Sequence, residues 1–276
     1  MTTGYFEMGD GAMYYEVGGA ADAEVTLVLN HAGFLDSGMW DAQWEAFTQD
    51  FRVLRYDMRG FGNSAPVTAP RCRRDDTRRL LAHLQIERAH FVGCSVGGEI
   101  ALDLALETPD LVQSLILVNS VPSGFEMQGE PPPYVLAMIG ALQAGDFAHA
   151  SELQLRIWFD GPQRTPDQVD GVVRRQAGGM NLRYVTAQTW LIADSEPATP
   201  LMPPAIQRLE AIPVPTLIMT GALDHAENLR ASALLAARIP TAQTIPFAHS
   251  AHVPNMEEPQ AFNAAVMGFV RARQAV

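Results

Sequence analysis

Residues 93–97 of this 276-residue chain read Gly-Cys-Ser-Val-Gly and stand between two segments of different periodicity. The apolar run 89–92 suits a buried strand, and residues 100–106 have helical spacing. A strand that turns directly into a helix holds the residue between them, Ser95, in a strained backbone conformation, and glycines on either side permit the close approach that this turn needs. We therefore expect the Ser95 hydroxyl at the carboxyl end of the strand, above a helix N-terminus.

Short apolar runs recur along the whole chain, and most of them are separated by stretches with helical spacing. This rhythm predicts βα units around a parallel sheet that is buried on both faces. The expected strands are an opening antiparallel hairpin at 5–8 and 12–17, then 25–29, 53–56, 90–92, 115–118, 216–219 and 241–247, with a closing helix at 260–271.

The rhythm breaks between residues 122 and 205, where proline-rich stretches mark the exit and the return. We expect a core built from residues 1–121 and 206–276, with a helical cap at 122–205 inserted after one strand. An insertion over the carboxyl ends of the strands is where a substrate pocket belongs. The large side chains of the cap, most of which we expect in its own core, are Tyr134, Met138, Trp158, Phe159, Met180, Tyr184 and Trp190.

Composition excludes several classes of function. The net charge of -12 leaves no basic footprint for nucleic acid, and anionic membrane surfaces would repel the chain. All 19 basic residues are arginine, so chemistry that needs a lysine amine is excluded, as are phosphate-loop nucleotide hydrolases. The two cysteines form no Cys-x-x-Cys pair and suggest a reducing compartment. With no secretory signal and no apolar run of about 18 residues, we expect a cytoplasmic protein.

A serine hydroxyl becomes a good nucleophile only when an imidazole takes its proton, and an acid must orient that imidazole. The C-terminal third of the chain supplies both groups. Asp224 follows the strand at 216–219, and His249 and His252 follow the strand at 241–247. The resulting order of Ser, Asp and His is that of one particular fold.

Two further segments support this assignment: His-Ala-Gly-Phe at 31–34, and Tyr-Asp-Met-Arg-Gly-Phe-Gly-Asn-Ser at 56–64. With these and the pentad around Ser95, the chain resembles α/β-hydrolase-fold enzymes over nearly its whole length, least in the cap. The resemblance implies an α/β fold with a mostly parallel eight-stranded sheet, helices on both faces and an inserted helical cap. It also implies catalysis by Ser95, Asp224 and His252, with no metal and no organic cofactor.

The family's register before the last helix, counted back from Glu258 and Pro259, favours His252 over His249 as the catalytic base. A metal bound by these two histidines is not expected, because no third and fourth ligands stand nearby in the sequence. Cys94 is expected to be an inert buried thiol.

In similar proteins two backbone N–H groups bind the oxyanion, and here they are those of Val96 and Gly33. Phe34 is the alternative second donor, since alanine replaces the usual glycine at position 32. We expect His31 to brace this loop through a hydrogen bond, and Asp57 to pair with Arg59.

The expected substrate is a small or medium, largely apolar ester or lactone, hydrolysed through an acyl-enzyme. C–C bond hydrolysis and cofactor-free perhydrolysis use the same triad in similar proteins, and a small-molecule receptor is the alternative outside catalysis. The intact triad favours an enzyme, and the oligomeric state stays open. The expected pocket residues are Phe34, Leu35, Val121, Trp158, Phe159 and Val253.

Overall fold

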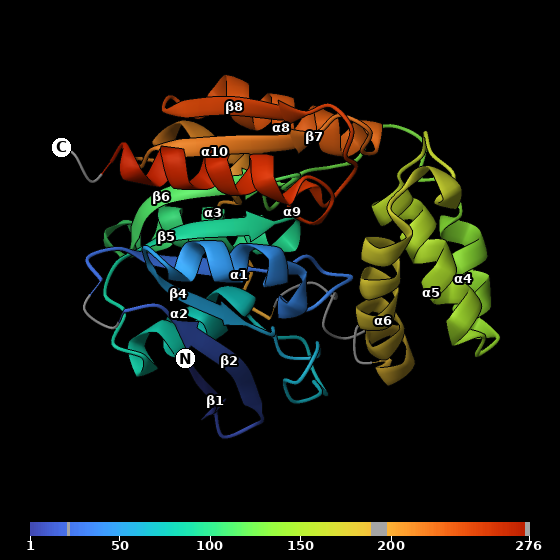
Figure 1. Cartoon of the computed structure of the whole chain (residues 1–276), viewed down its shortest axis with the longest axis horizontal. Coiled ribbons are helices and arrows are strands. Elements are labelled where there is room, and N and C mark those ends of the chain that lie inside the picture. Colours follow the sequence, from blue (N-terminus) through green and yellow to red (C-terminus); the bar gives the residue numbers. More distant parts are fainter. Residues whose placement is uncertain (21–22, 189–197, 274–276) are drawn as a thin grey trace.

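The computed structural model of the chain describes residues 1–20, 23–188 and 198–273. Its eight described strands form one sheet in the order β1-β2-β4-β3-β5-β6-β7-β8 (Figure 1). The pairs β1–β2 and β2–β4 are antiparallel and all other pairs are parallel. The strands are β1 (Thr2–Glu7), β2 (Ala12–Gly18), β3 (Thr26–Asn30), β4 (Arg52–Tyr56), β5 (Ala89–Cys94), β6 (Val112–Val118), β7 (Thr216–Gly221) and β8 (Ala242–Phe247). The expected fold class is thus confirmed, with strand ends shifted by at most three residues.

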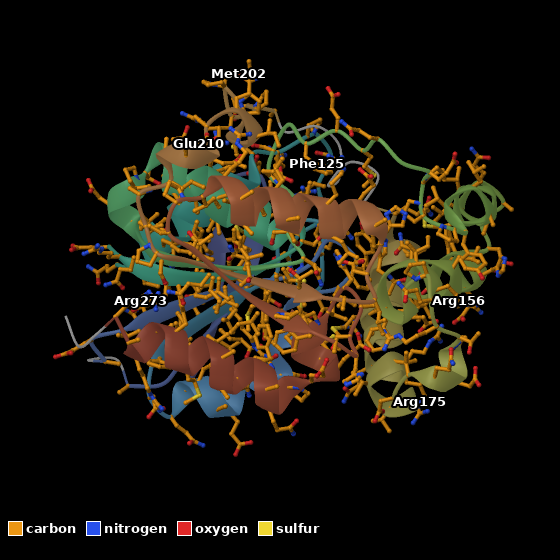
Figure 2. All side chains as sticks on the ribbon, turned by 90° about the horizontal axis from the view of Figure 1, so that it is seen from above. Phe125, Arg156, Arg175, Met202, Glu210 and Arg273 are labelled. Atoms are coloured by element: carbon orange, nitrogen blue, oxygen red, sulfur yellow. The ribbon has the colours of Figure 1, made fainter. Side chains whose placement is uncertain are left out.

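Both faces of the sheet are covered by helices, as the continuous apolar strands require (Figure 2). One apolar layer joins Leu27 and Leu29 of β3 to α1 and α10, and the other joins Val28 to α2, α3 and α8. Alternate residues of β3 therefore face opposite layers, as the two-residue period of a strand dictates. The covering helices are α1 (Asp41–Thr48), α2 (Arg73–His83), α3 (Val96–Glu107), α8 (Ala226–Arg238), the short α9 (Pro254–Glu257) and α10 (Pro259–Arg271).

Three further helices, α4 (Val135–Gln143), α5 (Phe147–Gln154) and α6 (Gly171–Ala187), stand beside one end of the sheet (Figure 1). A π-helix, Leu155–Asp160, follows α5 directly. All four helices lie within residues 122–205, the segment expected to form the cap, and we keep that name for it. Of the residues expected in its core, Phe159, Met180 and Tyr184 are buried, Met138 and Trp158 are half-buried, and Tyr134 is exposed. Trp190 lies outside the described residues. No helix within the described ranges is long and apolar enough to cross a membrane.

The expected pairing of Asp57 with Arg59 is wrong. Asp57 accepts hydrogen bonds from the backbone N–H groups of Ser37 at 2.8 Å and Asn63 at 2.7 Å. Arg59 instead binds both oxygens of Asp76, at 2.8 and 2.6 Å. Each oxygen of Asp57 accepts one backbone N–H from a different loop, so this carboxylate holds the two loops beside β4 in place.

Candidate active site

Ser95 connects β5 to α3 with φ of +54° and ψ of −121°, a conformation that non-glycine residues rarely adopt. Its own N–H donates to the Val118 carbonyl at 2.9 Å. A Cβ atom added at Gly93 would lie 2.4 Å from the Gly97 carbonyl oxygen, and one at Gly97 would lie 2.3 Å from the Asn30 carbonyl oxygen. Both glycines of the pentad are therefore required sterically, and together they hold the Ser95 turn against the end of β3.

His252 lies in the loop between β8 and α9, and Asp224 lies in the loop after β7. The Nδ1 atom of His252 is 2.7 Å from Oδ2 of Asp224, and the two residues are 2% and 1% exposed. A carboxylate accepts only, so Nδ1 carries the proton and donates it. In the neutral ring Nε2 is then the unprotonated nitrogen, which is the form a general base needs.

Asn119, directly after β6, is a residue that the sequence analysis did not single out. Its backbone φ is +43°, and its Nδ2 group donates to the carbonyls of Ala251 and His252, each at 3.0 Å. Its Oδ1 atom accepts the Gly221 N–H at 3.1 Å. One buried amide therefore fixes the loop that carries His252 against the end of β7.

Asn228, in the first turn of α8, is a second residue that the sequence analysis missed. Its Nδ2 group lies 3.0 Å from each carboxylate oxygen of Asp224 and 3.1 Å from Nδ1 of His252. Asp224 also accepts the N–H of His225 at 2.7 Å. The only sequence signal was its position, four residues after Asp224 at the start of a helix, where the two side chains can meet.

Ser95 and His252 line the same cavity, whose volume is about 220 Å³. The expected oxyanion and pocket residues Gly33, Phe34, Val96, Val121 and Trp158 line it too. Lining residues that were not predicted are Met127, Gln154, Tyr184 and Asn228.

Three expected pocket residues, Leu35, Phe159 and Val253, do not line this cavity. Each is fully buried in the apolar layer on the α1 and α10 side of the sheet. Each directly follows a lining residue in the chain, and its side chain packs in that layer instead of facing the cavity.

The backbone N–H groups of Gly33 and Val96 are available to a ligand, since neither donates to another backbone carbonyl within the described residues. Val96 is the first residue of α3, where helix geometry leaves the N–H without an internal acceptor. His31 braces the neighbouring loop as expected: Nε2 accepts the Met58 N–H at 2.9 Å, so Nδ1 donates to the Ala32 carbonyl at 2.8 Å. Burial lowers the pKa of His31, which keeps this bridging form neutral.

The competing candidates are placed differently. His249 is exposed and does not line the cavity, and its carbonyl accepts a hydrogen bond from Arg164. Cys94 is fully buried, and burial, with Asp224 nearby, raises the pKa of its thiol well above the usual value. A protonated thiol is a poor nucleophile. Within the part of the chain that is described, no three His, Cys, Asp or Glu side chains are grouped to hold a metal.

The π-helix is the part of the cap that contacts the His252 loop. The carbonyl of Trp158 accepts the His252 N–H at 3.3 Å, and the two rings lie 5.1 Å apart. Arg164 donates to the carbonyls of Phe159 and Asp160 at 3.0 and 2.8 Å, which the end of the helix would otherwise leave unpaired.

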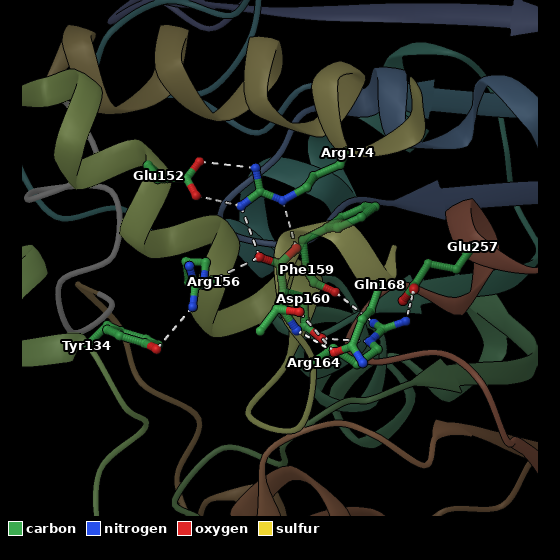
Figure 3. Close-up of polar contacts among 10 residues, drawn as sticks. Tyr134, Glu152, Arg156, Phe159, Asp160, Arg164, Gln168, Arg174 and Glu257 are labelled. Atoms are coloured by element: carbon green, nitrogen blue, oxygen red, sulfur yellow. Dashed lines mark hydrogen bonds and ion pairs between the residues drawn. The ribbon is translucent and has the colours of Figure 1, made fainter. Parts of the chain in front are cut away.

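The same arginine also reaches the core. Arg164 binds Oε2 of Glu257 at 2.6 Å (Figure 3). It also donates to the His249 carbonyl at 2.9 Å, and the Oε1 atom of Glu257 accepts the Ala251 N–H. On the cap side, Arg174 binds both oxygens of the fully buried Asp160 at 2.8 and 2.9 Å. Two half-buried arginines therefore fix the π-helix on both sides.

The mostly parallel sheet, the strained serine turn between strand and helix, and the Asp and His loops after the last two strands together define a hydrolase-type α/β protein. The family model described as alpha/beta hydrolase fold matches residues 25–259. The chain belongs to the alpha/beta hydrolase family.

Individual relatives agree with this assignment. The chain is 29% identical over 273 residues to the putative carbamate hydrolase RutD of Rhizobium rhizogenes, covering 96% of this chain and 100% of that protein. It is 28% identical to 3-oxoadipate enol-lactonase 2 of Acinetobacter baylyi, over 93% of this chain and 92% of that protein. Among solved structures, a hydrolase from Pseudomonas aeruginosa PA01 superimposes with a TM-score of 0.78 at 29% identity, covering 97% of this chain and 98% of that one.

Proposed function

We propose that this protein is a serine hydrolase that cleaves a small or medium neutral ester or lactone through an acyl-enzyme. The observation that carries the proposal is the contact of His252 with Asp224 at 2.7 Å, in a cavity that His252 shares with Ser95 on its strained turn. This is the nucleophile, base and orienting acid that acyl transfer requires.

In the proposed reaction, Ser95 Oγ attacks the ester carbonyl while Nε2 of His252 takes the hydroxyl proton. Asp224, held by Asn228, stabilises the imidazolium, and the N–H groups of Val96 and Gly33 bind the oxyanion. His252 then gives its proton to the leaving alcohol oxygen as the C–O bond breaks. His252 then takes a proton from water, which attacks the acyl-enzyme. As the bond from the acyl carbon to Ser95 Oγ breaks, His252 returns the proton to Oγ and the acid is released.

The cavity supports a largely apolar acyl group. Phe34, Val121, Met127 and Trp158 supply apolar lining, and no Asp, Glu or Arg occurs among the described lining residues. A volume of about 220 Å³ fits a compact substrate, below the range of roughly 300–1,000 Å³ that is usual for drug-sized ligands. A carbamate is the second candidate, because several relatives are named putative carbamate hydrolases and the same attack on a carbonyl would cleave it.

Steady-state hydrolysis of an ester, lactone and carbamate panel tests the proposal. Ser95→Ala should lower kcat by at least about 10⁴-fold, since the remaining site lacks its nucleophile. His252→Ala should cause a comparable loss, whereas His249→Ala, at the exposed neighbouring histidine, should keep the wild-type rate. A fluorophosphonate should label the wild type and not Ser95→Ala. Labelling that persists in Ser95→Ala, or equal losses in the two histidine variants, would overturn the assignment.

A further inference from the structure

Gln154, the last residue of α5, is a polar side chain in the cavity wall for which the proposed chemistry gives no role. It is 6% exposed, so its amide lies within the protein except where it borders the cavity. Its contacts decide which end of that amide faces a ligand.

The orientation follows from a chain of hydrogen bonds that begins at a backbone carbonyl. The Phe34 carbonyl can only accept, so the group of Asn181 that lies 2.9 Å from it is the Nδ2 donor. The same Nδ2 group lies 2.6 Å from Gln154, whose contacting atom must then be the acceptor Oε1. The Nε2 group of Gln154 is therefore the end that does not contact Asn181.

This Nε2 group is an unused donor. It makes no hydrogen bond to any described residue, although the side chain is more than nine-tenths buried and lines the cavity. A ligand that covers this donor without supplying an acceptor takes it away from water, which is unfavourable, so a ligand oxygen placed there gains affinity that an apolar group of the same size cannot.

We propose that Gln154 is a specificity-determining residue whose Nε2 group binds a second oxygen of a neutral substrate, such as a ketone, amide or hydroxyl oxygen remote from the carbonyl that is cleaved. This inference rests on the proposed function for the cleaved bond and adds the substrate class. A carboxylate at this second position is disfavoured, because no Lys or Arg among the described lining residues would compensate for its desolvation.

Equilibrium binding to Ser95→Ala tests the inference without turnover. The probes are methyl hexanoate, its 3-oxo, 4-oxo and 5-oxo derivatives, and monomethyl adipate, titrated against tryptophan emission, to which Trp158 in the cavity wall contributes. At least one oxo ester should bind about 3- to 10-fold more tightly than methyl hexanoate, the range expected for one hydrogen bond. Monomethyl adipate should bind more weakly than methyl hexanoate.

Three second substitutions in the Ser95→Ala background isolate the donor. Gln154→Met removes both polar atoms, and Gln154→Glu keeps an acceptor for Asn181 but has no donor at pH 8, so both should abolish the preference for the oxo ester. Gln143→Met makes the same change at an exposed position on α4 and should preserve that preference. An oxo ester preference that survives both Gln154 variants, or none at all in Ser95→Ala, would overturn the inference.

Turnover by the protein with Ser95 intact separates this result from the proposed function. If the protein hydrolyses methyl hexanoate but Ser95→Ala shows no preference for binding an oxo ester, only the role of Gln154 is refuted. A binding preference that depends on Gln154, without hydrolysis of any ester, refutes only the proposed reaction.

Discussion

The ion pair between Arg164 and Glu257 should contribute strongly to stability, because its side chains are only 11% and 10% exposed. Arg164→Met would leave Glu257 buried with a single remaining donor, the Ala251 N–H, and would remove three hydrogen bonds to carbonyl groups. Breaking a buried pair by removing one partner costs about 3–5 kcal/mol. We expect a loss in that range at pH 8, measured as a shift of the urea midpoint at unchanged m value.

The pH dependence of this loss gives a second check. Burial already raises the pKa of Glu257, and Arg164 opposes that rise. Without Arg164 the pKa rises further, so the folded variant takes up a proton that the unfolded chain does not hold. The penalty should therefore shrink as the pH falls from 8 to 5, by no more than about 1.4 kcal/mol per pH unit.

Two further variants test whether the pair itself is responsible. Arg164→Met combined with Glu257→Gln should be less destabilised than the sum of the single variants, because the double variant leaves no unpaired charge. Arg156→Met removes a more exposed partner, 3.7 Å from Asp160, and should cost less than about 1 kcal/mol. A cost below 1 kcal/mol for Arg164→Met, or a fully additive double variant, would refute the reasoning.

Three other variants address single contacts. His90 is buried beside β6, and burial, reinforced by Arg273, lowers its pKa to about 4. Because the unfolded chain binds this proton more tightly than the folded protein, the free energy of unfolding is highest above about pH 6.5 and is about 3 kcal/mol lower at pH 4. Urea unfolding of His90→Gln should show a smaller loss between these pH values, and an equal loss would contradict the assignment. Asn228→Ala should lower kcat by about 10- to 100-fold through loss of a donor to Asp224, without an equal fall in stability; an unchanged kcat would exclude that role. Gly98→Ala places a Cβ 1.8 Å from Ser120 Oγ and 2.6 Å from Ser120 Cβ, and should cost about 1–3 kcal/mol of unfolding free energy, part of which Ser120→Gly restores. Equal midpoints with and without Ser120→Gly would show that the clash lies elsewhere.

The fold was predictable because its signals are local. Each strand is a short apolar run, and five consecutive residues are enough to predict the turn at Ser95. Asp224 and the pair His249 and His252 follow from chain order together with the loop positions after two strands. The choice of His252 over His249 rests on the family's register before the last helix, so no distance had to be known.

The amides could not be predicted in the same way. Asn119 and Ala251 are 132 positions apart, and neither periodicity nor charge connects them before the sheet brings the ends of β6, β7 and β8 together. Gln154 and Asn181 interact only once the cap helices pack together. The sequence does not specify which partner such a polar side chain will contact, and only the folded structure does.

The three misplaced pocket residues have a related cause. Trp158 and Phe159 lie within a π-helix, whose wider turn shifts the phase of the side chains relative to an α-helix. Which of two adjacent aromatic residues faces the cavity therefore cannot be read from helical spacing. For Leu35 and Val253, which lie in loops, no period exists to apply.

The hydrogen bond from the His252 N–H to the Trp158 carbonyl has a consequence for protein engineering. Chimeras that exchange the cap to alter selectivity would disturb this backbone hydrogen bond to the His252 loop if their junctions fell inside residues 155–164. Grafts that retain residues 155–164, with Arg164 and its acceptors, should keep His252 in position. The segment from α4 to the end of α5 can then be exchanged.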